Sequence, residues 1–176
     1  MKHIMMVISL IALTPLVASA EAEWQVFTSK DGGFAVAMPG RPTFTATTDH
    51  TVVGDVMENL YSLNTPTALF SAEYSDLPGV ATFFESDDSL YDDAKEGLLK
   101  RTGGKLTSYY GIEQVGIKGK EVECEILAAG RAPVKRLRAR FLLKDKRLYV
   151  LSITIPGGQK DDPLFPRYLD SFRLLK

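Results

Sequence analysis

Hydrophobic and polar residues alternate along much of the chain, which is the period-two pattern of β-strands with one buried face. Phe34, Val36 and Met38 form one such apolar set, and the turn-forming residues 30–33 separate it from the β-prone segment 24–28. These two segments predict a hairpin. Further strands are expected at 43–48, 52–63 and 67–74.

Two segments follow a helical period instead. Apolar residues recur every fourth position over 89–101, with acidic residues before them and basic residues at the end, an order that complements the helix macrodipole. Gly103-Gly104 should end this helix. A second, short helix is expected to begin at Asp162-Pro163 and to close the chain by packing on the sheet as far as Phe172.

Between the helices, three glutamates and three arginines each alternate with apolar residues. A turn near 129–132 would place the two runs side by side, with opposite charges on one face and Cys124 opposite Leu137 on the other. A register shifted by two residues would leave the same side chains on each face, so the pairing is a hypothesis. It pairs Glu125 with Arg136, Glu123 with Arg138 and Glu121 with Arg140.

We expect this charge ladder to be exposed to solvent. The alternative, a nucleic-acid patch over residues 135–140, is disfavoured because alternation sends only half of these residues to each face. The next strand, 148–155, is expected to pair through a three-residue loop at 145–147. That loop sets Phe141 beside Leu151, whereas a two-residue loop would set Arg140 there.

The N-terminus has the pattern of a secretory signal peptide. Lys2 and His3 precede a mostly apolar run from Ile4 to Val17, and the small residues Ala18-Ser19-Ala20 follow. The run is too short to cross a bilayer, which takes roughly 20 apolar residues. We expect cleavage near Ala20, leaving residues 21–176 as a single, soluble, periplasmic or secreted α+β domain.

Composition narrows the chemistry of this mature chain. The whole sequence has one Cys and two His, so neither a disulfide nor a Cys-based zinc site can form within it. Cleavage removes Lys2 and no acidic residue, which changes 21 basic and 22 acidic residues to a net charge of −2. Such a near-neutral chain is not expected to bind nucleic acid. Cys124 is expected to be a small buried hydrophobe.

Motifs for catalysis or for metal and cofactor binding are not found, and none of these activities is expected. His50 lies in a polar stretch between predicted strands and is expected in an exposed loop. The acidic residues at the start of the first helix lack the spacing of a calcium loop, and the helix macrodipole explains them. They are Asp87, Asp88, Asp92 and Asp93.

Two adjacent aromatic pairs, Phe83-Phe84 and Tyr109-Tyr110, provide the candidate partner surface. In an extended segment neighbouring side chains point in opposite directions, so one member of each pair should face away from the core. Such a surface could bind a protein partner or an apolar ligand.

The start of the mature chain resembles the "G-F-x-V-x-x-P-x-x-P" opening of small bacterial envelope proteins with the PsbP-like (Mog-type) fold. The matching residues run from Gly33-Phe34 to Pro42, after Trp24 and Phe27. Later segments agree: a mid-chain helix, 119–123, 147–151 and 169–174. The resemblance implies an antiparallel β-sheet flanked by helices, a PsbP-like α/β/α sandwich. Photosystem members of the superfamily assist a metal centre, but no residue here matches a metal-binding motif.

The resemblance further implies a non-catalytic accessory or binding role, because the superfamily is dominated by such proteins. We therefore expect an exported binding protein of the cell envelope, acting on another envelope protein or on a small apolar ligand. The alternatives are a carrier of an apolar ligand and a small carboxylate-dependent hydrolase. The hydrolase would need a pocket with at least two converging ionisable groups, and the carrier would need an apolar cavity.

Overall fold

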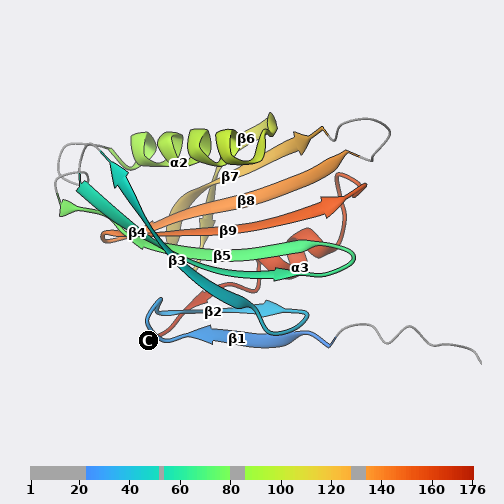
Figure 1. The fold of residues 1–176 in the computed structure, drawn as a ribbon, viewed down its shortest axis with the longest axis horizontal. Helices are drawn as coiled ribbons and strands as arrows, with labels where there is room; N and C mark the ends of the chain where they lie inside the picture. The colour runs from blue at the N-terminus through green and yellow to red at the C-terminus, as the bar shows by residue number, and fades with distance from the viewer. Residues whose placement is uncertain (1–22, 52–53, 80–85, 128–133) are drawn as a thin grey trace, which may run out of the picture.

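A long antiparallel sheet forms the middle layer of the molecule (Figure 1). The computed structural model describes residues 23–51, 54–79, 86–127 and 134–176. Within them, seven strands pair in the order β3-β4-β5-β9-β8-β7-β6. They are β3 (Thr43–Thr51), β4 (Gly54–Asn64), β5 (Leu69–Asp76), β6 (Lys105–Gln114), β7 (Ile117–Ile126), β8 (Lys135–Lys144) and β9 (Arg147–Pro156).

The two faces of this sheet are covered differently. Helix α2 (Asp87–Thr102) packs on β7 and β8 on one face, whereas α3 (Leu164–Leu169) and a small sheet cover the other (Figure 1). The small sheet contains β1 (Gln25–Ser29), β2 (Phe34–Met38) and β10 (Arg173–Leu174). The predicted hairpin is therefore confirmed as β1 and β2.

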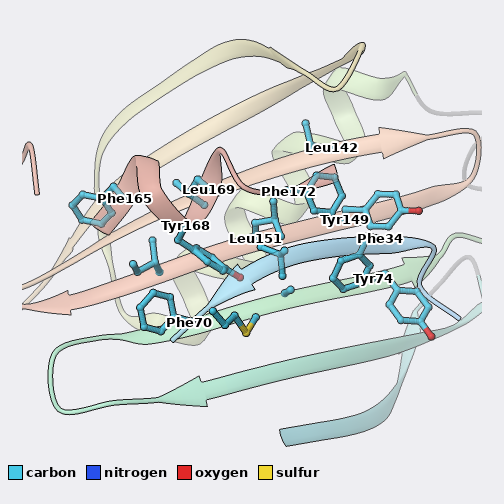
Figure 2. Close-up of a cluster of buried hydrophobic side chains, with 14 of the residues drawn as sticks. Phe34, Phe70, Tyr74, Leu142, Tyr149, Leu151, Phe165, Tyr168, Leu169 and Phe172 are labelled. Atoms are coloured by element: carbon cyan, nitrogen blue, oxygen red, sulfur yellow. The ribbon is translucent and has the colours of Figure 1, made fainter. Parts of the chain in front are cut away.

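The main core lies between the two sheets. Phe34, Val36 and Met38 are fully buried there, as their shared strand face predicts. The Phe34 ring meets those of Tyr149 and Phe172, with ring centroids 6.0 and 5.7 Å apart (Figure 2). The C-terminal segment thus joins the N-terminal hairpin to the large sheet, and these aromatic contacts hold the layers together.

A second core lies beneath α2. Ser86 caps the N-terminus of α2, and its hydroxyl accepts a hydrogen bond from the Ser89 amide. Gly103, with φ 64°, caps the C-terminus. Tyr91 and Leu98 face the sheet and are buried. They pack with Cys124 and other side chains of β7, β8 and β9. The predicted first helix and the buried position of Cys124 are both confirmed.

The antiparallel α+β class is confirmed, but the sheet is flanked by helices only in part. Strands dominate the described residues, and on the face opposite α2 the small sheet and α3 both contribute side chains to the core. The second helix ends at Leu169, earlier than expected, and the chain then pairs with β2 through β10. Strand β10 has only two residues, too few for an alternating pattern to be recognised in the sequence.

The expected three-residue loop between β8 and β9 is wrong. Strand β8 ends at Lys144 and β9 begins at Arg147, so the loop has two residues and Arg140 lies opposite Leu151. Asp145 adopts φ 57°, the left-handed conformation that tight hairpin turns require. Both faces of the sheet are covered here, so an arginine can share a face with Leu151, and burial does not select the loop length.

The Glu–Arg register is confirmed at all three pairs, with Cys124 opposite Leu137. The expected exposure of the ladder is wrong for its inner pairs, since Glu121 is only 2% exposed. Arg140 reaches Asp170, which follows α3, at 2.7 Å, and Arg138 donates to the Lys160 carbonyl at 3.0 Å. The segment around α3 therefore covers one end of the ladder.

No helix in the described ranges is both long enough and apolar enough to span a membrane. The expected leader, residues 1–20, lies outside these ranges, and so do Phe83 and Phe84.

Candidate functional site

A cleft of about 290 Å³ opens beside α2, where the large sheet continues past the strands on which the helix packs. We call it the α2 cleft. Its floor comes from β8 and β9, its walls from β3, β4 and β5 on one side and from α2 on the other. The lining residues are Asp49, Val56, Glu58, Glu73, Ser75, Leu77, Asp93, Ala94, Gly97, Leu98, Arg101, Phe141, Leu148 and Val150.

The strand register explains why these side chains share one face. Glu73 lies opposite Leu60 on β4 and Val150 on β9. Val150 in turn lies opposite Phe141, which belongs to the core beneath α2. Directly opposed residues of an antiparallel pair point to the same face. Glu73 is therefore placed toward α2 by pairing alone.

Gly97 leaves space on the helix side of the cleft. Apart from the helix's own backbone and its chain neighbours, no heavy atom lies within 4 Å of the position that a Cβ would take there. A Cβ at residue 97, which lines the cleft, would therefore occupy open space. The absence of a side chain in glycine thus contributes to the open volume of the cleft.

Glu58, Glu73 and Arg101 form the charged centre of the cleft. The Arg101 guanidinium lies 3.7 Å from a carboxylate oxygen of Glu58 and 3.7 Å from one of Glu73. The side chain of Glu73 is only 12% exposed, against 33% for Glu58 and 53% for Arg101. One half-exposed cation is thus shared by two carboxylates, one of which is largely removed from water.

Burial is the main reason that the pKa of Glu73 is raised, from 4.5 to about 7. The neighbouring Glu58 carboxylate raises the pKa further, and Arg101 offsets part of the effect. Glu73 therefore exchanges its proton near neutral pH, which is a property of functional carboxylates. Chemically, the site can accept a cation or transfer a proton.

No sequence motif singles out Glu58, Glu73 or Arg101. One signal is present: Glu73 carries a charge inside the apolar and aromatic segment predicted as the strand 67–74. A charged residue in such a strand can lie at an exposed edge, on a solvated face or in a buried ion pair. Strand β5 is central in the sheet and the Glu73 side chain is only 12% exposed, so the first two explanations do not apply.

The predicted partner residues Tyr109 and Tyr110 lie on opposite faces of β6. Tyr109 packs in the core beneath α2, with the Lys95 ammonium 4.7 Å from its ring centre. Tyr110 is 42% exposed, and its hydroxyl donates to Glu121 at 2.6 Å. One member of the pair thus faces away from the core, while the other does not contribute to the same surface.

His50 lies on strand β3 rather than in a loop, which extends that strand beyond its predicted end. Its side chain is 79% exposed, and Nδ1 lies 2.7 Å from Asp55. Cys124 is buried, and burial raises the pKa of its thiol to about 11. Neither residue lines the α2 cleft.

The described part of the molecule has other hollows, and two of them are of comparable size. One of about 340 Å³ lies beside Arg140, which is already paired with Glu121 and Asp170. A more open one of about 490 Å³ lies between Pro66-Thr67 and the β9–α3 connection, and its ionisable side chains are Asp161 and Asp162. The α2 cleft differs from both in combining a buried ionisable group with an apolar floor.

Comparison with known proteins identifies the fold only. No protein-family model and no curated protein sequence matches the chain. The solution structure of cyanobacterial PsbP (CyanoP) from Synechocystis sp. PCC 6803 is similar, with a TM-score of 0.59 and 14% sequence identity over 92% of this chain and 98% of that one. The fold is therefore PsbP-like.

Two further solved structures are more distant. A Pseudomonas aeruginosa protein of unknown function has a TM-score of 0.39 and 15% identity, over 69% of this chain and 88% of that one. A protein from Bacteroides thetaiotaomicron VPI-5482 has a TM-score of 0.45 and 12% identity, over 86% of this chain and 48% of that one.

Proposed function

We propose that this protein is an exported, non-catalytic binding protein of the cell envelope, and that the α2 cleft is its ligand site. The signal-peptide pattern of residues 1–20 supports export to the periplasm or beyond. The PsbP-like fold supports an accessory role, because this superfamily is dominated by accessory and binding proteins. In this role the ligand is an envelope protein or a small molecule with an apolar part.

The observation that carries the proposal is the composition of the cleft. Phe141 and Val150 on the floor and Leu98 on the α2 wall provide apolar surface, and each of these side chains is at most 8% exposed. Binding sites are typically concave and mostly apolar, with a few convergent polar groups that orient the ligand. Glu58, Glu73 and Arg101 are such groups, and they meet across the cleft from β4, β5 and α2.

A small carboxylate-dependent hydrolase is the second candidate, favoured by Glu58 and Glu73 in the same cleft. Two neighbouring carboxylates can divide the roles of acid and base. However, both carboxylates pair with Arg101, and a neutral sugar or ester that displaced this cation would leave them without a compensating charge.

Substitution of Gly97 tests the binding proposal, because it fills the cleft from the helix side. The tagged full-length chain is exported in its own host, crosslinked, and captured from the envelope as wild type, Gly97→Leu and Gly97→Trp. We expect the partner or ligand to be lost from both Gly97 variants, while their thermal unfolding remains cooperative.

Gly111→Trp is the matched control, since a Cβ at Gly111 on β6 also meets no atom within 4 Å and this residue does not line the cleft. Loss of capture in Gly111→Trp alone would move the binding surface to β6 and Tyr110, and would contradict the proposal. Turnover of nitrophenyl esters or glycosides that disappears in Glu73→Gln would instead favour the hydrolase.

A further inference from the structure

We infer that the α2 cleft takes the ammonium group of a ligand whose remaining part is apolar. The inference rests on the proposed function and names the chemical class that the cleft would bind. A free alkylamine and a lysine side chain of a partner protein both present this chemistry.

The charge of the lining favours a cation. Asp49, Glu58, Glu73 and Asp93 line the cleft, and Arg101 is the one basic side chain among the described residues that do so. With all groups ionised, the lining carries a net charge of −3. Arg101 therefore neutralises only a part of the negative charge, and an anionic ligand would be repelled.

The carboxylates also retain hydrogen-bonding capacity. Both ion pairs of Arg101 measure 3.7 Å, which is longer than a charge-assisted hydrogen bond of about 2.7–2.9 Å. An ammonium group has three donors and could approach both Glu58 and Glu73 more closely than the guanidinium does. Because Arg101 is 53% exposed, its side chain can move toward solvent as the ligand enters.

Because Glu73 is buried, an ammonium group would stabilise its carboxylate. A carboxylate that is 88% buried and lacks a close cation loses much of its hydration without full compensation. A neutral ligand would remove the remaining water and leave this carboxylate less well compensated. An ammonium ligand would supply the missing positive charge, so it is preferred over an alcohol of the same length.

A metal ion fits this chemistry less well than an organic cation. No group of three or more His, Cys, Asp and Glu side chains in the described ranges is placed to hold a metal. Phe141, Leu148 and Val150 on the floor and Leu98 on the α2 wall offer no ligand atoms to a metal but can contact an alkyl chain. The favoured ligand therefore has both a cationic head and an apolar body.

The test uses three probes with one alkyl chain and different heads: hexylammonium, hexanol and hexanoate. Calorimetric titration of the mature protein is expected to show binding of hexylammonium, at least about tenfold weaker binding of hexanol, and no binding of hexanoate. Loss of one charged partner typically weakens binding by about tenfold or more, so Glu73→Gln should show such a loss. Glu113→Gln, outside the cleft on β6, should bind as wild type does.

A second arm separates the two sources of the ammonium group. The envelope extract is first filtered to separate proteins from small molecules, and half of the protein fraction is treated with acetic anhydride, which removes the charge of lysine side chains. Capture of a protein that is lost after acetylation would indicate a lysine of a protein partner, whereas binding to the small-molecule fraction alone, together with hexylammonium binding, would indicate a small amine.

Two results would overturn the inference. Equal binding of hexanol and hexylammonium would make the cleft an apolar carrier site. Failure of all three probes, with capture that does not depend on lysine acetylation, would exclude an ammonium ligand. In either case, loss of capture in Gly97→Trp would leave the proposed binding function standing, whereas unchanged capture in that variant would refute the function itself.

Discussion

Glu73 shows how one residue acquires its properties from its position. The same carboxyl on a surface strand would titrate near pH 4.5, but its burial beside Glu58 raises the pKa to about 7. The shift means that folding disfavours the ionised form. Arg101 limits the effect without removing it, because its guanidinium is half exposed and shared.

Replacing Glu73 with Gln should therefore change how stability depends on pH. Between about pH 4.5 and 7, the unfolded wild-type chain gives up the Glu73 proton before the folded chain does, so the stability of the wild type falls as pH rises. Gln does not titrate. Relative to wild type, Glu73→Gln should gain up to about 3 kcal/mol between pH 4.5 and pH 8.

Urea unfolding at both pH values measures this difference, and Glu113→Gln serves as the matched control outside the cleft. A stability difference between wild type and Glu73→Gln that is the same at both pH values would show that the Glu73 carboxyl is not the buried, titrating group described above.

Gly97 is the second residue whose role is local. It lies inside α2, where glycine costs the helix about 0.5–1 kcal/mol relative to alanine. Because a Cβ there meets no atom within 4 Å, Gly97→Ala should raise the free energy of unfolding by that amount. Thermal or urea unfolding measures it. Gly103→Ala provides the contrast and should be destabilising, since Gly103 has φ 64°.

At the scale of elements, the β7–β8 pairing shows how one charge ladder acquires two environments. The outer pair, Glu125–Arg136, is about one-third exposed on each side, whereas Glu121 is buried and bonded to Arg140 and Tyr110. The cover comes from the segment around α3, which lies far away in sequence. Pairs with the same chemistry should therefore differ in their contribution to stability.

Arg140→Met should cost about 3 kcal/mol, because it leaves the buried Glu121 carboxylate with only the more distant Arg138 guanidinium, at 3.7 Å. Arg136→Met should cost no more than about 1 kcal/mol, as for exposed ion pairs. The double variant Glu121→Met/Arg140→Met should recover much of the loss, because it removes both buried charges. Urea unfolding of the set measures these values, and equal costs for Arg136→Met and Arg140→Met would contradict the difference in burial.

At the scale of the whole molecule, we predict that the protein is exported. The full-length chain expressed in a Gram-negative host should be found in the periplasm, and its intact mass should correspond to a chain that begins at Glu21. Deletion of residues 2–20 should keep the protein in the cytoplasm. Fractionation and mass spectrometry check both outcomes, and a periplasmic or membrane-bound chain of unprocessed mass would contradict cleavage.

Sequence patterns determined those features that depend on neighbouring residues. Period-two alternation placed Phe34, Val36 and Met38 on one buried face, and charge alternation predicted the Glu121–Arg140 pairing. Fourfold spacing with matched end charges predicted α2. Each of these patterns records a constraint within one element or between two consecutive strands, so it can be recognised without knowing the rest of the fold.

Only the tertiary structure decided which face of each strand is covered, and by what. Alternation separates the two faces of a strand but does not say whether either meets water. The fold covers both faces of the sheet, which buries Glu121, permits the two-residue turn after Lys144, and desolvates Glu73 beside α2. The cleft exists because residues from six elements, distant in sequence, meet around an uncovered part of one sheet face.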